Sequence, residues 1–309
     1  MKILVLLRRN ILGQNNYSEA KEAFLLQLQK ENNWNLILRD YEDSKKQYNM
    51  LNFIISLGKK FLEFLYFLGG LGALFLQMLR WSFSRPFEIR RTLVQAKRTG
   101  WDSLPIISVI SFFIGLIMAL QTAYLMQRLG SEMYIASIVA LSLVRELGPV
   151  LTALVVAGRV GASIAAEIGT MQVTEQIDAL ETLAYSPIKY LVVPRFLALI
   201  LMLPLLTIYA NTIGIFGGYA ICVYKLGITS GMYLNITFDA IFSKDLFTGL
   251  AKSVVFGMVI AISSCYQGLK VAGSSEGVGR ATTDAVVISF VLIITADCLF
   301  TALFYFIFL

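Results

Sequence analysis

Five long apolar runs fill most of the C-terminal two thirds of the sequence, and they restrict the chain to very few folds. The runs are Leu104–Met126, Tyr134–Ala157, Leu191–Tyr224, Leu246–Tyr266 and Ala285–Phe308. Each meets or exceeds the roughly 20 residues that a helix needs to cross the hydrocarbon of a bilayer. The sequence therefore predicts an all-α integral membrane protein with five transmembrane helices.

The composition agrees with a chain that is solvated by lipid. Hydrophobic residues make up 57% of it and charged residues 15%, whereas a soluble domain carries about 25% charge. The net charge is +6, but the basic residues flank apolar runs, which favours orientation against anionic lipid over binding of nucleic acid. The sequence has no histidine, so neither a catalytic nor a metal site is expected.

The N-terminal part is divided at about residue 50. Residues 1–50 are predicted to be a polar extension of unknown role, with short strands at Ile3–Leu7 and Asn35–Leu38 and a helix at Ser18–Lys30. Residues 51–309 form the membrane domain. Within it, residues 51–79 are apolar but are interrupted by Gly69, Gly70 and Gly72, which predicts an amphipathic or re-entrant elbow helix; a full span is the alternative.

Lysine and arginine set the predicted orientation. Residues 80–100 are strongly basic and are expected to form a helix on the cytoplasmic membrane face. With this segment inside, the inner loops hold eleven basic residues and the outer loops hold Arg128, Lys225 and Lys244. Cytoplasmic loops carry the excess of Lys and Arg, so Leu309 is expected outside.

The segment Gly158–Arg195 connects the second and third spans and is read as a cytoplasmic loop. Within it, one face of a short helix is formed by Val173, Ile177, Leu180 and Ala184, at i, i+4, i+7 and i+11. Acidic residues lie off this face or at its edge: Glu175, Asp178 and Glu181. Two interpretations stay open, namely a docking surface for a basic protein partner and a solvated interfacial helix. Small residues precede this helix, from Gly158 to Ala166, and allow close helix packing.

Four charged residues lie well inside the spans: Arg145, Glu146, Lys252 and Asp297. A charge at the bilayer centre costs roughly 2.5–3.5 kcal/mol on insertion scales. The signs balance, so internal ion pairs are expected, in particular between Lys252 and Asp297. Glu146 precedes Gly148–Pro149, where a helix kinks, and is our candidate gate or cavity residue. Neighbours on a helix point about 100° apart, so only one of Arg145 and Glu146 is expected to face a cavity.

The first span carries polar side chains among its apolar ones. Gln121 and Tyr124 lie close to Leu116 and Leu120. This mixture suits the lining of a path for an amphipathic lipid. It also suits residues at the outer membrane interface, where tyrosine is enriched.

Several of these segments together resemble the MlaE/YrbE permease family. The resemblance covers roughly residues 55–309 and rests on Leu141–Pro149 (LSLVRELGP), Ala157–Thr170 (AGRVGASIAAEIGT), Thr174–Leu180 (TEQIDAL), Pro194–Arg195 and Gly279–Val287 (GRATTDAVV). It implies a permease subunit of an ABC transporter that moves phospholipid or a related lipid between the inner and outer membranes. It also implies an elbow helix before five spans, in the cell inner membrane.

The resemblance further implies partners and site residues. Such permeases form homodimers, dock on a cytoplasmic ABC ATPase through the helix at Val173–Ala184, and carry a periplasmic MCE protein. The lipid cavity lies at the dimer interface, along the spans that hold Gln121, Tyr124 and Glu146. ATP and Mg are bound by the partner ATPase, and this chain, which has no GxxxxGK[ST] motif, needs no cofactor of its own.

Two other function classes remain. An ion-coupled secondary transporter would use the intramembrane carboxylates as a relay, but internal repeats are not visible and the TEQIDAL helix would have no role. A membrane-embedded enzyme acting on lipid would need a nucleophile–base pair or a metal cluster, and the sequence supports neither.

Overall fold

The computed structural model describes residues 34–84 and 88–308, and all regular structure within them is helical. The chain divides into two compact units, Met1–Leu68 and Gly69–Leu309. By length and composition, six helical runs among the described residues are able to cross a membrane. They are Ile55–Ser82, Ile89–Arg128, Glu132–Val173, Ile188–Tyr224, Ser243–Leu269 and Ser275–Phe306. An all-α membrane protein is thus confirmed.

Helix α3 (Trp34–Ser82) begins in the first unit and ends in the second. The predicted strand at Asn35–Leu38 is wrong, because these residues belong to α3 and a short apolar segment follows the helix that its neighbours form. The segments Ile3–Leu7 and Ser18–Lys30 lie outside the described residues. The boundary predicted at residue 50 stays a prediction.

The glycines of α3 were expected to bend the chain, but they are part of the helix. Gly70 allows a close approach instead: a side chain there would begin 2.5 Å from the hydroxyl of Tyr266 on α12. The elbow therefore stays a prediction, and the alternative full span agrees with the 28 residues of Ile55–Ser82.

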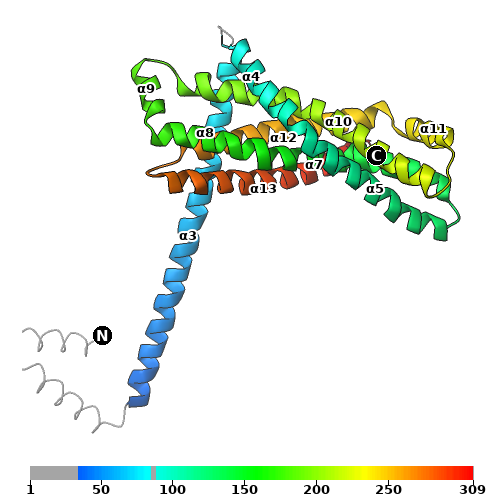
Figure 1. Ribbon diagram of the computed structural model, residues 1–309. Helices are drawn as coiled ribbons and strands as arrows, with labels where there is room; N and C mark the ends of the chain where they lie inside the picture. Colours follow the sequence, from blue (N-terminus) through cyan, green and yellow to red (C-terminus); the bar gives the residue numbers. More distant parts are fainter. Residues whose placement is uncertain (1–33, 85–87, 309) are drawn as a thin grey trace, which may run out of the picture. The chain divides into compact units, whose positions relative to one another are not determined.

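The second unit continues as a bundle of long helices (Figure 1). Helix α4 (Ile89–Gly100) leads through the short η1 (Trp101–Ser103) into α5 (Leu104–Arg128). A second continuous run follows η2 (Glu132–Tyr134) and contains α6 (Ile135–Ser142), the π-turn η3 (Leu143–Leu147), α7 (Gly148–Val156), the π-turn η4 (Ala157–Gly161) and α8 (Ala162–Val173). The remaining elements are α9 (Gln176–Thr182), η5 (Ile188–Val192), α10 (Val193–Tyr224), α11 (Ser230–Ala240), α12 (Ser243–Leu269) and α13 (Ser275–Phe308).

All five predicted spans are helical, but the second is much longer than expected. The residues 158–173, read as part of a loop, continue the helix as η4 and α8. Their small side chains allow the approach of α12, where Gly268 lies against Ala165 and Ile168. In lipid, small residues favour this kind of packing, so a stretch that has little apolar bulk is nevertheless a buried helix. The helix α11, between the third and fourth spans, was not predicted.

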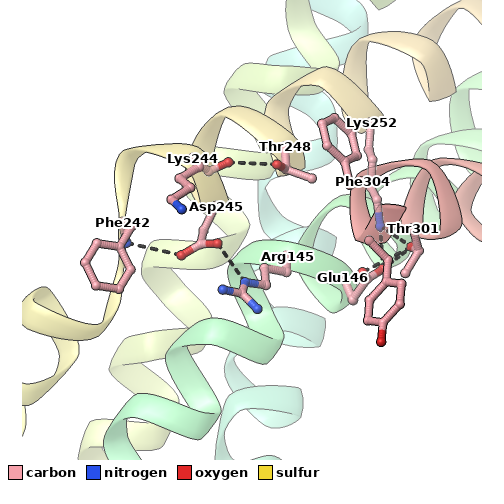
Figure 2. A pocket seen from close by; sticks show the side chains of 10 residues that line it. Arg145, Glu146, Phe242, Lys244, Asp245, Thr248, Lys252, Thr301 and Phe304 are labelled. Atoms are coloured by element: carbon pink, nitrogen blue, oxygen red, sulfur yellow. Dashed lines mark hydrogen bonds and ion pairs between the residues drawn. The ribbon is translucent and has the colours of Figure 1, made fainter. Parts of the chain in front are cut away.

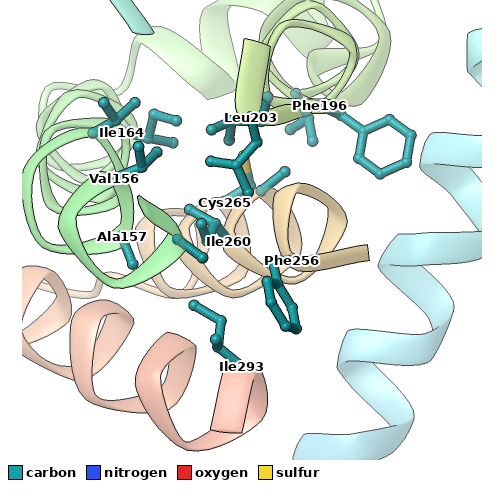
Figure 3. Packing of buried hydrophobic residues seen from close by; sticks show 14 of the residues in the cluster. Val156, Ala157, Ile164, Phe196, Leu203, Phe256, Ile260, Cys265 and Ile293 are labelled. Atoms are coloured by element: carbon teal, nitrogen blue, oxygen red, sulfur yellow. The ribbon is translucent and has the colours of Figure 1, made fainter. Parts of the chain in front are cut away.

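The core of the second unit lies where α7, α8, α10, α12 and α13 meet (Figure 3). Its labelled members are Val156, Ala157, Ile164, Phe196, Leu203, Phe256, Ile260, Cys265 and Ile293. A second cluster joins α5, α6, α10 and α11 around Tyr233. Helix α5 approaches α10 so closely that a Cβ on Gly115 would collide with the carbonyl oxygen of Gly214.

Candidate functional site

A cavity of about 420 Å³ lies between η3, the first turns of α12 and the last turns of α13. Figure 2 shows the ten side chains that line it, and five of them are charged. The charged members are Arg145, Glu146, Lys244, Asp245 and Lys252. Aromatic rings complete the wall, from Phe242, Phe304 and Tyr305.

The backbone at this cavity is a π-turn, and the sequence gives its cause. Pro149 has no N–H group and therefore cannot bond to the carbonyl of Arg145 four residues earlier. The helix widens over Leu143–Leu147, just before this proline. Gly148 is buried against Asn211, and a Cβ there would collide with the amide oxygen of that side chain. Such π-turns occur often at functional sites, and this one presents Arg145 and Glu146 to the cavity.

Lys252 is the centre of the charge cluster and is fully buried. Its ammonium group lies 2.5 Å from Oε2 of Glu146 and 2.9 Å from Oδ1 of Asp297. It also donates to Oγ1 of Thr301 at 2.7 Å, and Thr301 in turn donates to Glu146. The expected pair of Lys252 and Asp297 is therefore present, but Glu146 is a second partner that the sequence did not reveal.

Arg145 contacts a carboxylate on α12, the helix that also carries Lys252. Its Nε lies 2.8 Å from Oδ1 of Asp245. Asp245 also accepts from the backbone N–H of Phe242 and so caps the start of α12. Since Asp245 and Lys252 are seven residues apart, two turns of α12 place them on one face. On that face, Asp245 is the partner of Arg145, and Lys252, two turns later, is the partner of Glu146.

The expectation that only one of Arg145 and Glu146 would face a cavity is wrong, because both line this one. The cavity extends over two turns of α12, and long side chains that diverge by about 100° can both reach it. The side chain of Glu146 stays 41% exposed although it is paired.

The candidate lipid-lining residues of the first span lie elsewhere. Leu120, Gln121 and Tyr124 are exposed on α5 and Leu116 is partly buried. Among the described residues, none of those that line the cavity around Glu146 comes from α5. Within one chain, these residues and Glu146 do not form a common pocket. The ring of Tyr124 lies under Arg128, whose guanidinium carbon is 4.4 Å from the ring centroid.

The acidic helix is shorter than Val173–Ala184. Helix α9 covers Gln176–Thr182 and is preceded by Glu175 in a left-handed conformation, with φ of 58°. Ala184, just after it, has φ of 60°. Ile177 is buried in the core cluster, whereas the carboxylates of Glu175, Asp178 and Glu181 are exposed. Of the predicted apolar face, Ile177 is buried and Leu180 partly buried, whereas Val173 belongs to α8 and Ala184 is exposed beyond the end of α9. The docking role stays a prediction.

A second charge cluster ties α8 to two other helices. Glu167 accepts from Arg98 of α4 at 2.9 Å and from Arg195 of α10 at 2.8 Å. The Arg195 side chain is only 5% exposed and also donates to the carbonyl of Leu191. In the same helical run, Arg159 of η4 lies 3.5 Å from Asp102 of η1. These pairings were not predicted from the sequence; the feature that could have indicated them is a single carboxylate, Glu167, in a run of small and apolar side chains.

Comparison with known proteins identifies the class as an ABC transporter permease. Residues 92–303 match the model of the family described as Permease MlaE. The matched region includes the π-turn at Arg145 and Glu146, the Glu167 cluster and α9. The chain belongs to the MlaE permease family.

Curated relatives agree over most of the chain. A probable ABC transporter permease protein of Rickettsia felis is 45% identical over 83% of this chain and 99% of its own length. The intermembrane phospholipid transport system permease protein MlaE of Haemophilus influenzae is 35% identical over 82% of this chain and 98% of its own. The chloroplast protein TRIGALACTOSYLDIACYLGLYCEROL 1 of Arabidopsis thaliana is 40% identical over 70% of this chain and 62% of its own.

Proposed function

We propose that this chain is the membrane subunit of an ABC transporter that moves phospholipid between the inner and outer membranes. It resides in the inner membrane, and a separate cytoplasmic ATPase binds ATP and Mg and drives transport. The lipid substrate is supported by the Haemophilus relative, whose name describes intermembrane phospholipid transport. The observation that carries the ATPase partner is α9, which is anchored by Ile177 and exposes the carboxylates of Asp178 and Glu181 next to that of Glu175, the residue before the helix.

We propose further that two copies of the chain enclose the lipid path. The face of α5 that carries Leu120 and Tyr124 exposes large apolar side chains. A second copy would cover this face and place it opposite the cavity that holds Glu146, which a single chain does not do. A periplasmic MCE protein would continue the path outside the membrane. In this arrangement Glu146 repels lipid phosphate and favours release as the cavity narrows.

The ATPase contact is tested with Glu175→Lys/Asp178→Lys. Reversing two exposed charges should abolish pull-down of the ATPase and leave the melting temperature of the permease unchanged, because neither side chain is buried. The matched control is Glu276→Lys, a charge reversal at an exposed residue of α13. Undiminished pull-down by the double variant would contradict the proposal.

The lipid path is tested with photo-crosslinkers at positions 121, 124 and 146. All three should capture phospholipid in the assembled transporter, and one at Leu292 should capture less. Glu146→Gln should preserve assembly and alter transport or its coupling to ATP hydrolysis. Normal transport by this variant, with no lipid captured at position 146, would leave Glu146 a structural charge only.

The ion-coupled alternative is not favoured by the geometry. Glu146 and Asp297 both contact the ammonium of Lys252, so a proton carried by either would have to displace an ion pair.

A further inference from the structure

A second cavity lies away from the charge cluster, between the end of α3, the start of α4 and the start of α10. Its volume is about 440 Å³, within the range of roughly 300–1,000 Å³ that is typical of small-molecule sites. Its walls are mainly apolar and include Leu93, Val193, Leu197, Ile200 and Leu201. It shares no lining residue with the cavity around Glu146.

One side of this groove carries an aromatic ring with a cation above it. The ammonium of Lys189 lies 5.4 Å from the ring centroid of Trp81, and both residues line the groove. Arg91, which does not line the groove but is paired with the lining residue Glu88, lies with its guanidinium 3.3 Å from the ring centroid of Tyr190. Tryptophan and tyrosine are enriched at membrane–water interfaces, and basic side chains there extend their charges toward the headgroups. This side of the groove therefore has the chemistry of the headgroup level.

The charged residues that line the groove are Lys189 and Glu88. The acidic lining residue Glu88 is paired with Arg91 at 3.1 Å. An occupant should therefore combine an apolar chain with an anionic head. An ammonium group has three donors, so Lys189 can bind a phosphate oxygen while it remains above Trp81.

The apolar walls are also open to the surroundings of the bundle. Ile89 and Leu93 on α4 and Leu201 on α10 are exposed, by 64%, 63% and 59%. A hydrocarbon chain that enters between these helices would cover apolar surface on both sides. Water would form few hydrogen bonds there, because the apolar walls offer few polar partners.

We propose that this groove binds one anionic phospholipid of the adjacent leaflet. Its acyl chain lies between α4 and α10, and its phosphate contacts Lys189. The bound lipid joins the end of α3 and the start of α4 to the start of α10. The site is separate from the transport path proposed above and requires only that the groove faces the membrane.

The experiment compares lipids retained by the purified full-length chain in nanodiscs. The discs contain phosphatidylcholine with a minor fraction of phosphatidylglycerol, and bound lipid is measured by native mass spectrometry. The chain should retain one phosphatidylglycerol. Lys189→Glu should reduce this retention at least about tenfold, since each basic residue near the surface contributes about 1 kcal/mol to anionic lipid binding and a charge reversal changes this by about twice that amount.

Two matched controls distinguish a specific lipid site from a general attraction of anionic lipid to the basic surface. Lys270 also lies above a ring, 5.7 Å from the centroid of Tyr266, but it does not line the groove; Lys270→Glu should retain the lipid. A photo-crosslinker at Leu201 should capture phosphatidylglycerol above its bulk fraction, whereas one at Leu205, equally exposed one turn away, should capture lipids in bulk proportion.

Either of two results would overturn the proposal. One is equal loss of phosphatidylglycerol in Lys189→Glu and Lys270→Glu, which would indicate surface charge alone. The other is bulk lipid proportions at position 201, which would indicate ordinary annular lipid. Neither readout depends on ATP hydrolysis or transport, so failure here and failure of the proposed function are distinguishable.

Discussion

Replacement of Lys252 by methionine should be the most destabilising single change in the intramembrane charge cluster. Methionine keeps much of the length and the apolar stem of lysine and removes only the ammonium group. That group is fully buried and contacts Glu146, Asp297 and Thr301. Without it, two carboxylates of like charge remain in the same site with no cation between them.

The magnitude follows from which charges are left unpaired. Removal of one partner from a buried ion pair costs about 3–5 kcal/mol. Because Glu146 is 41% exposed and Asp297 23%, water relieves part of this penalty, and the lower end, about 3 kcal/mol, is expected for Lys252→Met. Asp297→Asn should cost less, about 1–2 kcal/mol, since Lys252 keeps Glu146 and Thr301.

The decisive variant removes all three charges. In Lys252→Met/Glu146→Gln/Asp297→Asn no ion is left unpaired, and replacement of a buried ion pair by neutral groups is often close to neutral. The triple variant should therefore be more stable than Lys252→Met alone. The free energy of unfolding in detergent is the measurement, and Lys244→Met, at an exposed lysine of the same cavity, is the control. If the losses simply add, the cluster is not energetically coupled and the reasoning is refuted.

Three further outcomes are expected. From the excess of inner basic residues, Asp178→Cys should react with impermeant thiol reagents only from the cytoplasmic side; labelling from outside would reverse the topology. Gly115→Ala should destabilise the chain by about 1–3 kcal/mol in detergent unfolding through collision with Gly214, while Gly158→Ala, which meets no atom within 4 Å, should be nearly neutral. Glu167→Gln should leave pull-down of the ATPase intact but weaken coupling of ATP hydrolysis to transport; full coupling would make Glu167 a packing residue only.

The transmembrane helices could be predicted because length and apolarity are local properties. Each of the five runs is helical, and residue type alone identified them. The end of the second span was missed for the same reason. Between Gly158 and Val173 most side chains are small or polar, and local hydropathy falls. What keeps this segment helical is contact with α12, through approaches such as that of Ala165 to Gly268, and such contacts are not encoded in a sequence window.

The charge cluster could be predicted only in part. Four intramembrane charges of balanced sign indicate ion pairs, because unpaired ones would be too costly. Which charges meet is decided by helices that are distant in sequence: Glu146 and Lys252 are 106 residues apart, and Arg145 and Asp245 are 100 apart. Asp245 was overlooked because it lies one residue before the predicted fourth span. Thr301 was overlooked because a hydroxyl group in an apolar helix gives no charge signal.

The helical run from Glu132 to Val173 connects the features that bear on function. It carries Glu146 in the charged cavity and Glu167 in the second cluster, and these are 21 residues apart (167 − 146), or about 30 Å along a helix. Only Thr174 and Glu175 separate its end from α9. Glu175 is held in a left-handed conformation, which costs a residue other than glycine about 1–2 kcal/mol, so the tight turn persists through the packing of Ile177. A displacement of α9 would therefore act directly on this run. Through Glu167 it would also act on α4 and α10, and at its other end it would shift Glu146 against Lys252.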